Sequence, residues 1–203
     1  ALERQKIEDE YADVQATIAY LVDLLGSPAK ILALIRADTI ALRDKYGDER
    51  RTRIELLGED VPLILFVGKL SARRNIPNLI AAFARARREK RLPHKLLLLG
   101  PNHVNLPLAQ LCAEHGVTDA VVQTDGKFTH HEDLIPIYSA ADVFVHPSWF
   151  EGWSMTTIEA LACGTATIAS DRGGLGDVAR GHALMLREPT VEALTDALCK
   201  VLL

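Results

Sequence analysis

Two different hydrophobic patterns divide the chain near residue 60. Before that point apolar residues recur in steps of four and three, and residues 2–25 contain no Pro or Gly. This spacing is typical of a helix that packs along one seam in coiled-coil fashion. The apolar residues of the seam are Ile7, Tyr11, Val14, Ile18, Leu21 and Leu25. The chain is therefore predicted to begin with a long helix.

A second helix is predicted directly after the first. Gly26 ends the periodic stretch, and Ser27 and Pro28 stand where an N-cap and a first-turn residue are expected. Gly47 ends this second helix. Two helices with so short a connection form an αα-hairpin, and the charged residues 48–51 are interpreted as its exit.

Beyond Val61 short apolar runs alternate with segments of helical length. The predicted strands are residues 63–67, 95–99, 120–124, 143–146, 165–169 and 183–186. The predicted helices are residues 77–90, 106–115, 131–140, 155–163 and 191–203. This alternation is typical of βαβ units around a parallel sheet that is covered on both faces. We therefore predict an α/β fold: a doubly wound, Rossmann-like domain over residues 59–203, preceded by an α-helical hairpin over residues 1–58.

Charge is distributed unevenly along the 203 residues, whose net charge is −4. Residues 69–95 hold nine basic residues and one acidic residue, whereas residues 96–203 hold five basic and thirteen acidic ones. A positive zone on a nearly neutral domain suggests an anion bound at one edge. The alternative is a solvated helix face, which we prefer for Arg85, Arg87, Arg88 and Arg91. The negative net charge indicates no nucleic-acid partner.

Cysteine usage and the lengths of the apolar runs bear on location. Cys112, Cys163 and Cys199 lie far apart and form no CxxC pair, so we interpret them as reduced thiols of a cytoplasmic protein. The apolar runs are too short for a membrane span, and no signal peptide opens the chain. Because the sequence begins at Ala1 and not at Met, we interpret it as an excised or engineered piece.

The first candidate site follows the strand predicted at residues 63–67 and reads GKLSARRN. Gly68 lets the backbone turn closely past a ligand. Lys69 and Arg74 then stand at the carboxyl end of the strand, where two cations can neutralise a diphosphate. Neither GxxxxGK[ST] nor GxGxxG is present. A Lys and an Arg in such a loop are also compatible with ordinary surface charge.

The second candidate site, HPSWFEGWSMTTIEA, follows the strand predicted at residues 143–146. Glu151 falls in the loop at the ligand edge. A helix begins behind it, and its first N–H groups favour a phosphate; the residues that lead into it are Gly152, Trp153, Ser154 and Met155. Glu159, one turn inside, can accept two hydroxyl protons from a ribose diol. The alternative is a solvated Glu159 beside Trp149, Phe150 and Trp153 in ordinary packing.

Two further loops and the histidines carry weaker signals. Gly173 and Gly174 allow the backbone to approach a small ligand, although a plain turn explains them nearly as well. Lys127 and Phe128 follow the third predicted strand and offer backbone groups or a ring to a base. The seven histidines form no HxH or HExxH pattern, so no metal site is assigned.

The segments FVGKLSARRNIPNLIAAFARA, LLLLGP, LIPIYSAADVFVHPSWFEGWSMTTIEALACGTATIASDRGG and VEALTDALCKVL occur in this order over residues 61–203. Together they resemble the carboxyl-terminal half of the group 1 retaining glycosyltransferases, which have two Rossmann-like domains in the GT-B fold. The spacing from Glu151 to Glu159, followed by EALACG, is the most specific part of this resemblance.

The resemblance implies roles for four residues. In that family the first Glu contacts the transferred sugar, the second binds the ribose, and an Arg and a Lys hold the diphosphate. The matching residues here are Glu151, Glu159, Lys69 and Arg74, of which Glu151, Lys69 and Arg74 would carry the catalytic work. The implied donor is a nucleotide diphosphate sugar, with retention of configuration and no required metal or other cofactor.

Some positions depart from the family pattern. Lys69 replaces the usual Arg, and Asn75 stands where Gly is common. Ser154 replaces a frequent Gly and Asp177 a frequent Glu, which leaves the choice of donor open. The amino-terminal domain that supplies acceptor recognition is missing, so the implied function is donor binding without transfer by this chain alone.

Residues 1–55 resemble a different family. The stretch LERQKIEDEYADVQATIAYLVDLLGSPAKILALIRADTIALRDKYGDERRTRI is similar to the A subunit of DNA gyrase, in its long helical arm. The simplest interpretation is a chimera, joined near residues 55–60. The hairpin is a candidate homodimer contact, and the alternative function is a non-catalytic scaffold or binding module.

Overall fold

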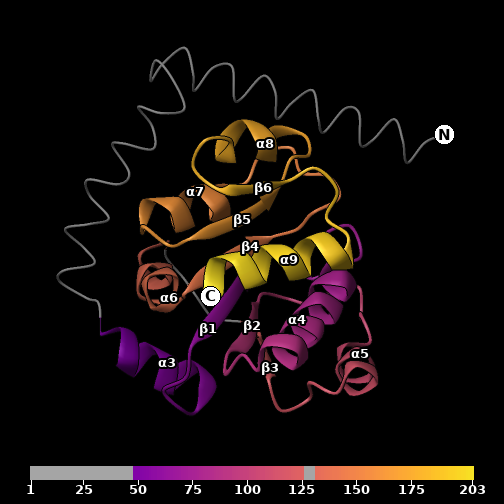
Figure 1. Ribbon diagram of the computed structural model, residues 1–203. Helices are drawn as coiled ribbons and strands as arrows, with labels where there is room; N and C mark the ends of the chain where they lie inside the picture. The colour runs from indigo at the N-terminus through magenta and orange to yellow at the C-terminus, as the bar shows by residue number, and fades with distance from the viewer. Residues whose placement is uncertain (1–47, 126–130) are drawn as a thin grey trace.

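The computed structural model describes residues 48–125 and 131–203 (Figure 1). The hairpin predicted before residue 48, and Lys127 and Phe128, lie outside these described residues. A six-stranded parallel sheet in the order β3-β2-β1-β4-β5-β6 forms the centre. Its strands are β1 (Leu63–Val67), β2 (Lys95–Leu99), β3 (Val121–Thr124), β4 (Val143–His146), β5 (Thr167–Ser170) and β6 (Leu184–Leu186).

Helices connect successive strands and cover both faces of the sheet (Figure 1). The α-helices are α3 (Glu49–Leu57), α4 (Ile76–Lys90), α5 (Leu108–His115), α6 (Ile135–Ala140), α7 (Met155–Ala162), α8 (Gly174–Ala179) and α9 (Val191–Leu202), and a 3-10 helix η1 (His131–Leu134) precedes α6. This is the predicted doubly wound, Rossmann-like arrangement. In the described part of the chain, no helix is long and apolar enough to cross a membrane.

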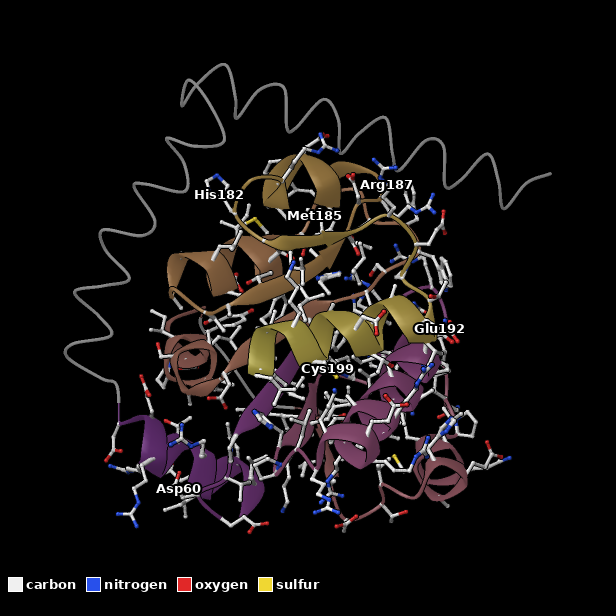
Figure 2. The ribbon with its side chains drawn as sticks, viewed as in Figure 1. Asp60, His182, Met185, Arg187, Glu192 and Cys199 are labelled. Atoms are coloured by element: carbon white, nitrogen blue, oxygen red, sulfur yellow. The ribbon has the colours of Figure 1, made fainter. Side chains whose placement is uncertain are left out.

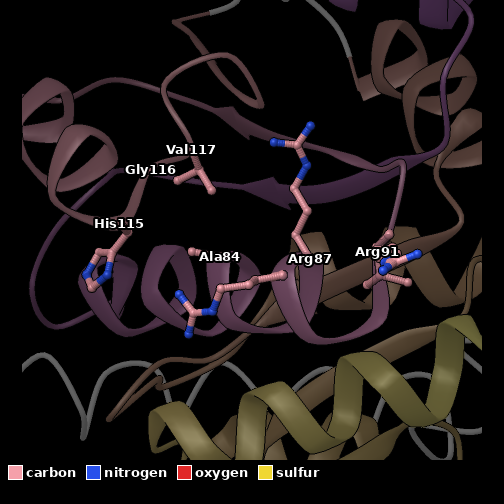
Figure 3. Close-up of a pocket in the computed structure, with 8 residues that line it drawn as sticks. Ala84, Arg87, Arg91, His115, Gly116 and Val117 are labelled. Atoms are coloured by element: carbon pink, nitrogen blue, oxygen red, sulfur yellow. The ribbon is translucent and has the colours of Figure 1, made fainter.

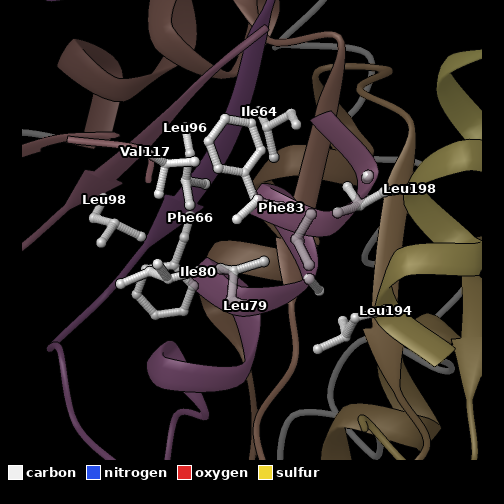
Figure 4. Packing of buried hydrophobic residues seen from close by; sticks show 14 of the residues in the cluster. Ile64, Phe66, Leu79, Ile80, Phe83, Leu96, Leu98, Val117, Leu194 and Leu198 are labelled. Carbon is white, nitrogen blue, oxygen red and sulfur yellow. The ribbon is translucent and has the colours of Figure 1, made fainter. Parts of the chain in front are cut away.

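Strand β1 shows why the sheet needs cover on two sides. All five of its residues are buried, and successive side chains point to opposite faces. Ile64 and Phe66 pack with Phe83 of α4 and Leu198 of α9, as Figure 4 shows. The residues on the other face join a second cluster with helices α3, α6 and α7; from β1 they are Leu63, Leu65 and Val67.

The strand order reverses between β1 and β4, which pair with Ile64 opposite Val143. In open α/β sheets a ligand crevice lies beyond the carboxyl ends of the strands at such a reversal. The loops after β1 and β4 contain the two candidate sites, so the topology brings them to one place.

Most predicted elements are found within two residues of the expected bounds, and three differ more. Residues 48–51, predicted as an exit, are the N-cap and first turn of α3, where the Asp48 carboxylate accepts a hydrogen bond from the Arg51 N–H at 2.9 Å. The predicted helix at residues 131–140 begins as the 3-10 helix η1. The loop around Gly174 is the short helix α8.

Helix α3 packs on α6 and adds Leu57 to the core. Its charged side forms ion pairs with Asp60, 2.8 Å from Arg53 Nε and 3.2 Å from Arg50 Nε (Figure 2 labels Asp60). Lys95 of β2 donates to the Leu57 carbonyl at 3.3 Å. The domain boundary predicted at residues 58 and 59 stays a prediction, but α3, on the hairpin side of it, contacts the sheet domain.

Candidate functional site

The loop after β1 and the loop after β4 lie against each other beyond the sheet edge. The Trp149 N–H donates to the Arg73 carbonyl at 3.0 Å, and Arg73 Nη1 donates to the Phe150 carbonyl at 3.0 Å. The second bond joins residues that are 77 positions apart in the chain. The structure therefore brings together the two loops that were predicted separately as candidate sites.

Arg74 and Glu151 form an ion pair at the centre of this contact. Arg74 Nη1 lies 2.7 Å from Glu151 Oε2 and 3.0 Å from His146 Nε2. The side chains of Arg74 and Glu151 are 17% and 10% exposed, so water screens the pair only weakly. Arg73 Nη1, 4.0 Å from the same carboxylate oxygen, adds a second positive charge.

Burial and charge set the ionisation of this group. Burial raises the pKa of Glu151, but its surroundings, which include the positive charges of Arg74 and Arg73, lower that pKa by more, so the net pKa is lowered. Burial lowers the pKa of His146. Burial also lowers the pKa of Arg74, which remains charged because a guanidinium is protonated throughout the ordinary pH range. The site thus holds a carboxylate, a guanidinium and a neutral imidazole at pH 7.

Helix α7 begins beside this group. Ser154 is its N-cap, and the Ser154 hydroxyl accepts a hydrogen bond from the Thr157 N–H at 3.2 Å. The N–H groups of Met155 and Thr156 belong to the first turn and have no intrahelical partner. They form a local positive pole that suits an anion. Gly152 and Trp153 are half-buried in the turn that leads to this pole, as the sequence predicted.

Glu159 lies one turn further along α7 and is half-buried. The buried Tyr138 hydroxyl donates to Glu159 Oε2 at 2.8 Å. Burial, and then the Glu159 charge, raise the pKa of Tyr138, which keeps its proton as a donor. Glu159 is therefore oriented by a partner and is not the freely solvated side chain of the alternative interpretation.

Lys69 and Gly68 occupy the turn after β1. Lys69 is exposed, so its ammonium group is accessible to a ligand. Gly68 has a φ of +143° and lies directly against Gly100, where an added Cβ would come within 2.1 Å of the Gly68 carbonyl oxygen. The two glycines thus let the loops after β1 and β2 cross in close contact.

The glycines after β5 contact protein backbone. A Cβ on Gly173 would lie 2.4 Å from the Glu151 carbonyl oxygen, and one on Gly174 would lie 1.7 Å from the Gly152 carbonyl oxygen. Their function in the structure is thus to let α8 pack against the loop that carries Glu151. This packing explains the two glycines, and the approach of a small ligand at this loop stays a prediction.

An aromatic group lies at the same edge. Trp149 is 41% exposed and Phe150 36%, and Met155 is 48% exposed. Trp149 and Phe150 are therefore only partly covered by packing, because the surface loop leaves part of each side chain in contact with solvent. Trp153 is half-buried. Large exposed apolar side chains that gather at one edge are typical of a binding surface.

A separate hollow of about 540 Å³ lies at the carboxyl ends of α4 and α5 (Figure 3). Because these helices run back from the ligand edge, the hollow belongs to the opposite edge of the sheet. Its basic lining residues are Arg87, Arg88, Arg91 and His115. Arg87 and Arg88 belong to the last turn of α4 and complement the helix dipole there. This fits the solvated helix face preferred from the sequence.

His146 is the residue to which the sequence assigned no role. It ends β4, is fully buried, and contacts Arg74, Glu151 and Ser154. A histidine at the last position of a buried apolar strand was the available signal. Within residues 48–125 and 131–203, no three His, Cys, Asp or Glu side chains gather in a way that could hold a metal ion.

The comparisons with known proteins agree with this geometry. Two curated relatives are D-inositol 3-phosphate glycosyltransferase of Nocardia farcinica, 30% identical over 187 residues, and MMP alpha-(1->4)-mannosyltransferase of Mycolicibacterium hassiacum, 31% identical over 186 residues. The matches cover 88% and 90% of this chain but only 41% and 42% of the relatives. The chain therefore spans about two fifths of the length of these relatives.

Solved structures give the same fold. Sucrose-phosphate synthase from Thermosynechococcus elongatus matches with a TM-score of 0.64 and 32% identity, over 76% of this chain and 39% of that one. The carboxyl-terminal domain of a group 1 glycosyl transferase from Francisella tularensis matches with a TM-score of 0.64 and 17% identity, over 77% of this chain and 83% of that one. The second likeness shows the fold alone.

A short stretch has a second similarity. The A subunit of DNA gyrase from Dehalogenimonas lykanthroporepellens is 51% identical over 57 residues, which make up 28% of this chain and 7% of the gyrase polypeptide. The family model described as "Glycosyl transferases group 1" matches residues 48–203, from α3 to the last residue. The chain therefore belongs to the group 1 glycosyltransferases.

Proposed function

We propose that residues 48–203 form the donor-binding domain of a retaining glycosyltransferase, which moves a sugar from a nucleotide diphosphate sugar to an acceptor. The observation that carries this proposal is the position of the Arg74–Glu151 pair. It lies at the reversal of strand order, beside the first turn of α7. A cation and a helix N-terminus at one crevice suit a diphosphate.

The diphosphate would be held by Arg74, Lys69 and the first N–H groups of α7. Arg74 Nε is buried and has no hydrogen-bond partner among the described residues, although Nη1 is engaged by Glu151 and His146. A phosphate oxygen would satisfy this orphaned donor, which is otherwise unfavourable in a buried site. Such fixed positive groups stabilise the charge that develops on a leaving diphosphate.

The two carboxylates would hold the remaining parts of the donor. Glu159, oriented by Tyr138, would accept hydrogen bonds from the ribose diol. Glu151 would contact the transferred sugar. Lys127 and Phe128 would offer contacts to the base. Because cations and helix N–H groups would neutralise the diphosphate, we propose that no metal ion or other cofactor is required.

Thermal unfolding with UDP, GDP and ADP, each with Mg²⁺ or with EDTA, tests this proposal. A ligand that binds only the folded chain at about 100 times its Kd adds about 2.7 kcal/mol to the free energy of unfolding. We expect one nucleotide to raise Tm equally in both buffers, and Arg74→Ala to abolish the shift. Arg85→Ala is the control, because Arg85 pairs with Glu89 on α4, 2.8 Å away. No shift with any nucleotide at millimolar concentration would contradict donor binding.

The base and the sugar stay open. A similar structure from Anabaena is a complex with UDP-glucose, and a similar protein from Escherichia coli is named O-antigen chain mannosyltransferase B. These names favour a hexose donor for the present site without selecting its base. A panel of donor sugars in the thermal experiment would separate them.

We also propose that this chain binds the donor without transferring the sugar. The acceptor in this family is held by an amino-terminal domain opposite the donor, and transfer requires both substrates to be oriented. A radiolabelled donor incubated with a broad acceptor panel should yield at most slow hydrolysis. A glycosylated product above the hydrolysis background would contradict this.

The similarity to the gyrase A subunit favours a second candidate function. In that case the chain is a chimera whose gyrase-derived segment dimerises as a scaffold for the sheet domain, in the cytoplasm. Light scattering tests the dimer: a monomer at micromolar concentration would remove the scaffold, whereas a dimer without any nucleotide binding would favour it over the donor-binding function.

A further inference from the structure

The buried imidazole of His146 connects the two elements that would hold the diphosphate. On one side Nε2 lies 3.0 Å from Arg74 Nη1. On the other side Nδ1 lies 3.1 Å from the Ser154 hydroxyl, the N-cap of α7. The imidazole thus contacts both elements at once. Because His146 is 0% exposed, these contacts are made without competition from water.

The distances assign the proton of the imidazole. A guanidinium nitrogen is always a donor, so Nε2 accepts from Arg74 and carries no proton. Glu151 Oε2, at 3.5 Å from Nε2, lies beyond a good hydrogen bond. Nδ1 then bears the proton and donates to Ser154. Burial favours this neutral form, because it lowers the pKa of His146.

This assignment of the proton is consistent with the hydrogen bonds that the Ser154 hydroxyl makes. The Ser154 oxygen accepts from His146 Nδ1 and, at 3.2 Å, from the Thr157 N–H. Its own proton is then free for the Thr157 hydroxyl, 2.8 Å away. On the other side Arg74 Nη1 donates to His146 Nε2 and forms an ion pair with Glu151 Oε2, 2.7 Å away. Both ring nitrogens of His146 therefore have a partner, and Arg74 Nε is the buried donor of this group that has none among the residues that the structure describes.

We propose that His146 is a positioning residue: in its neutral Nδ1–H form it fixes the Arg74 guanidinium relative to the first turn of α7. The inference rests on the proposed function in one respect, namely that the group held between these two elements is a diphosphate. His146 itself touches no substrate. Its loss should therefore weaken contacts to the phosphates and leave contacts to the nucleoside unchanged.

Two substitutions separate the two sides of the imidazole. The terminal amide of Gln reaches about as far as Nε2, so His146→Gln keeps an acceptor for Arg74. The shorter amide of Asn reaches about as far as Nδ1, so His146→Asn keeps only the donor to Ser154. His94→Gln is the control, since His94 is also a buried histidine (7% exposed) but precedes β2 at the opposite edge.

The first measurement needs no nucleotide. Nitrogen-15 NMR of the full chain should show the Nδ1–H tautomer of His146 near pH 7, and slow rotation of the Arg74 guanidinium in wild type and His146→Gln. In His146→Asn that rotation should be fast. An Nε2–H tautomer, a charged imidazole, or an Arg74 signal that is indifferent to His146 would overturn the proposal.

The second measurement compares the affinity for a nucleoside diphosphate with that for the matching nucleoside. His146→Asn should lower this ratio about tenfold, as expected for one lost bond to a charged group, whereas His146→Gln and His94→Gln should retain it. An equal loss for both ligands would mean that His146 only stabilises the fold, and would overturn the positioning role. A wild-type chain that binds no nucleotide, but passes the first measurement, would contradict the proposed function alone.

Discussion

Arg74 concentrates the electrostatics of the site in one side chain. Its guanidinium is largely buried, and one nitrogen, Nη1, serves both Glu151 and His146. A buried cation that loses its carboxylate is strongly unfavourable. Glu151 therefore stabilises the unliganded fold, in addition to the contact with sugar that we propose for it.

Replacing Glu151 by Gln should lower the free energy of unfolding by about 1–3 kcal/mol at pH 7. Folding lowers the pKa of Glu151 below the ordinary value of 4.5, so the carboxylate adds stability above that pH. The contribution disappears as the pH falls through the lower, folded pKa. Urea unfolding of wild type and Glu151→Gln between pH 3 and pH 7 should therefore converge in acid.

The control for this substitution is Glu55→Gln. Glu55 pairs with Arg51 at 2.8 Å on the surface of α3, where both side chains are well exposed. Its loss should leave the free energy of unfolding almost unchanged, because water screens an ion pair this exposed. A Glu151→Gln variant that behaves like Glu55→Gln at every pH would show that the buried pair adds no stability.

Glu159 gives a second prediction at the residue scale. Glu159→Ala should weaken the binding of a ribonucleoside diphosphate about tenfold or more, and that of its 2′,3′-dideoxy analogue far less, because only the diol donates to the carboxylate. Tyr138→Phe, which removes the hydroxyl that orients Glu159, should have a smaller effect in the same direction. Calorimetric titration of both ligands measures this, and equal weakening would assign Glu159 a structural role.

At the scale of elements, α8 acts as a support for the loop between β4 and α7. Gly174 brings the first turn of α8 against the Gly152 carbonyl, and α8 also packs on α7. The loop that carries Glu151 is therefore held between α8 on one side and the loop after β1 on the other. A loop held on two sides keeps its side chains in place before a ligand arrives, which favours binding.

Gly174→Ala should displace this support. The added Cβ would lie 1.7 Å from the Gly152 oxygen, so the backbone of the loop must shift. We expect a loss of about 1–3 kcal/mol in the free energy of unfolding and a weaker affinity for nucleoside diphosphates. Gly58→Ala is the control. An added Cβ at this position has no atom of the described residues within 4 Å, so the substitution introduces only the backbone strain of an alanine at a φ of +77°. Unchanged nucleotide affinity in Gly174→Ala would contradict the supporting role.

On the scale of the whole molecule, helix α3 joins the amino-terminal side of the chain to the sheet. Leu57 is 7% exposed within the core, and Glu59 lies 2.5 Å from Lys95 Nζ. The family match likewise begins at residue 48. These contacts indicate that α3 contributes to the stability of the sheet domain.

Two truncated chains test this contribution. A chain that starts at Asp48 should unfold as the sheet domain of the full chain does. One that starts at Asp60 should remain folded but lose about 2 kcal/mol, because the buried Leu57 is removed. Circular dichroism during urea unfolding compares them. Equal stability of the two chains would show that α3 is only attached to the surface, whereas an unfolded shorter chain would show that it completes the core.

Local pattern by itself determined the sheet strands and the family motifs. The bounds of β1, β2 and β4 agree with the prediction, because each strand is an apolar run whose side chains must be buried on both faces. The predicted start of α7 at Met155 is likewise confirmed. The glutamates at 151 and 159 and the cations at 69 and 74 were selected from their positions after predicted strands and from the family resemblance. The burial of a strand and the capping of a helix depend on residues that are close together in the chain. The local sequence is therefore sufficient to predict them.

Tertiary structure alone decided the contacts between loops that are distant in sequence. Helix α3 has no clear apolar stripe and α8 is rich in glycine, so neither could be predicted without the surfaces on which they pack. The pairing of Arg74 with Glu151 depends on β1 lying beside β4, and the place of His146 between Arg74 and Ser154 depends on that pairing. Strand order results from the packing of the whole sheet, and no local periodicity encodes it.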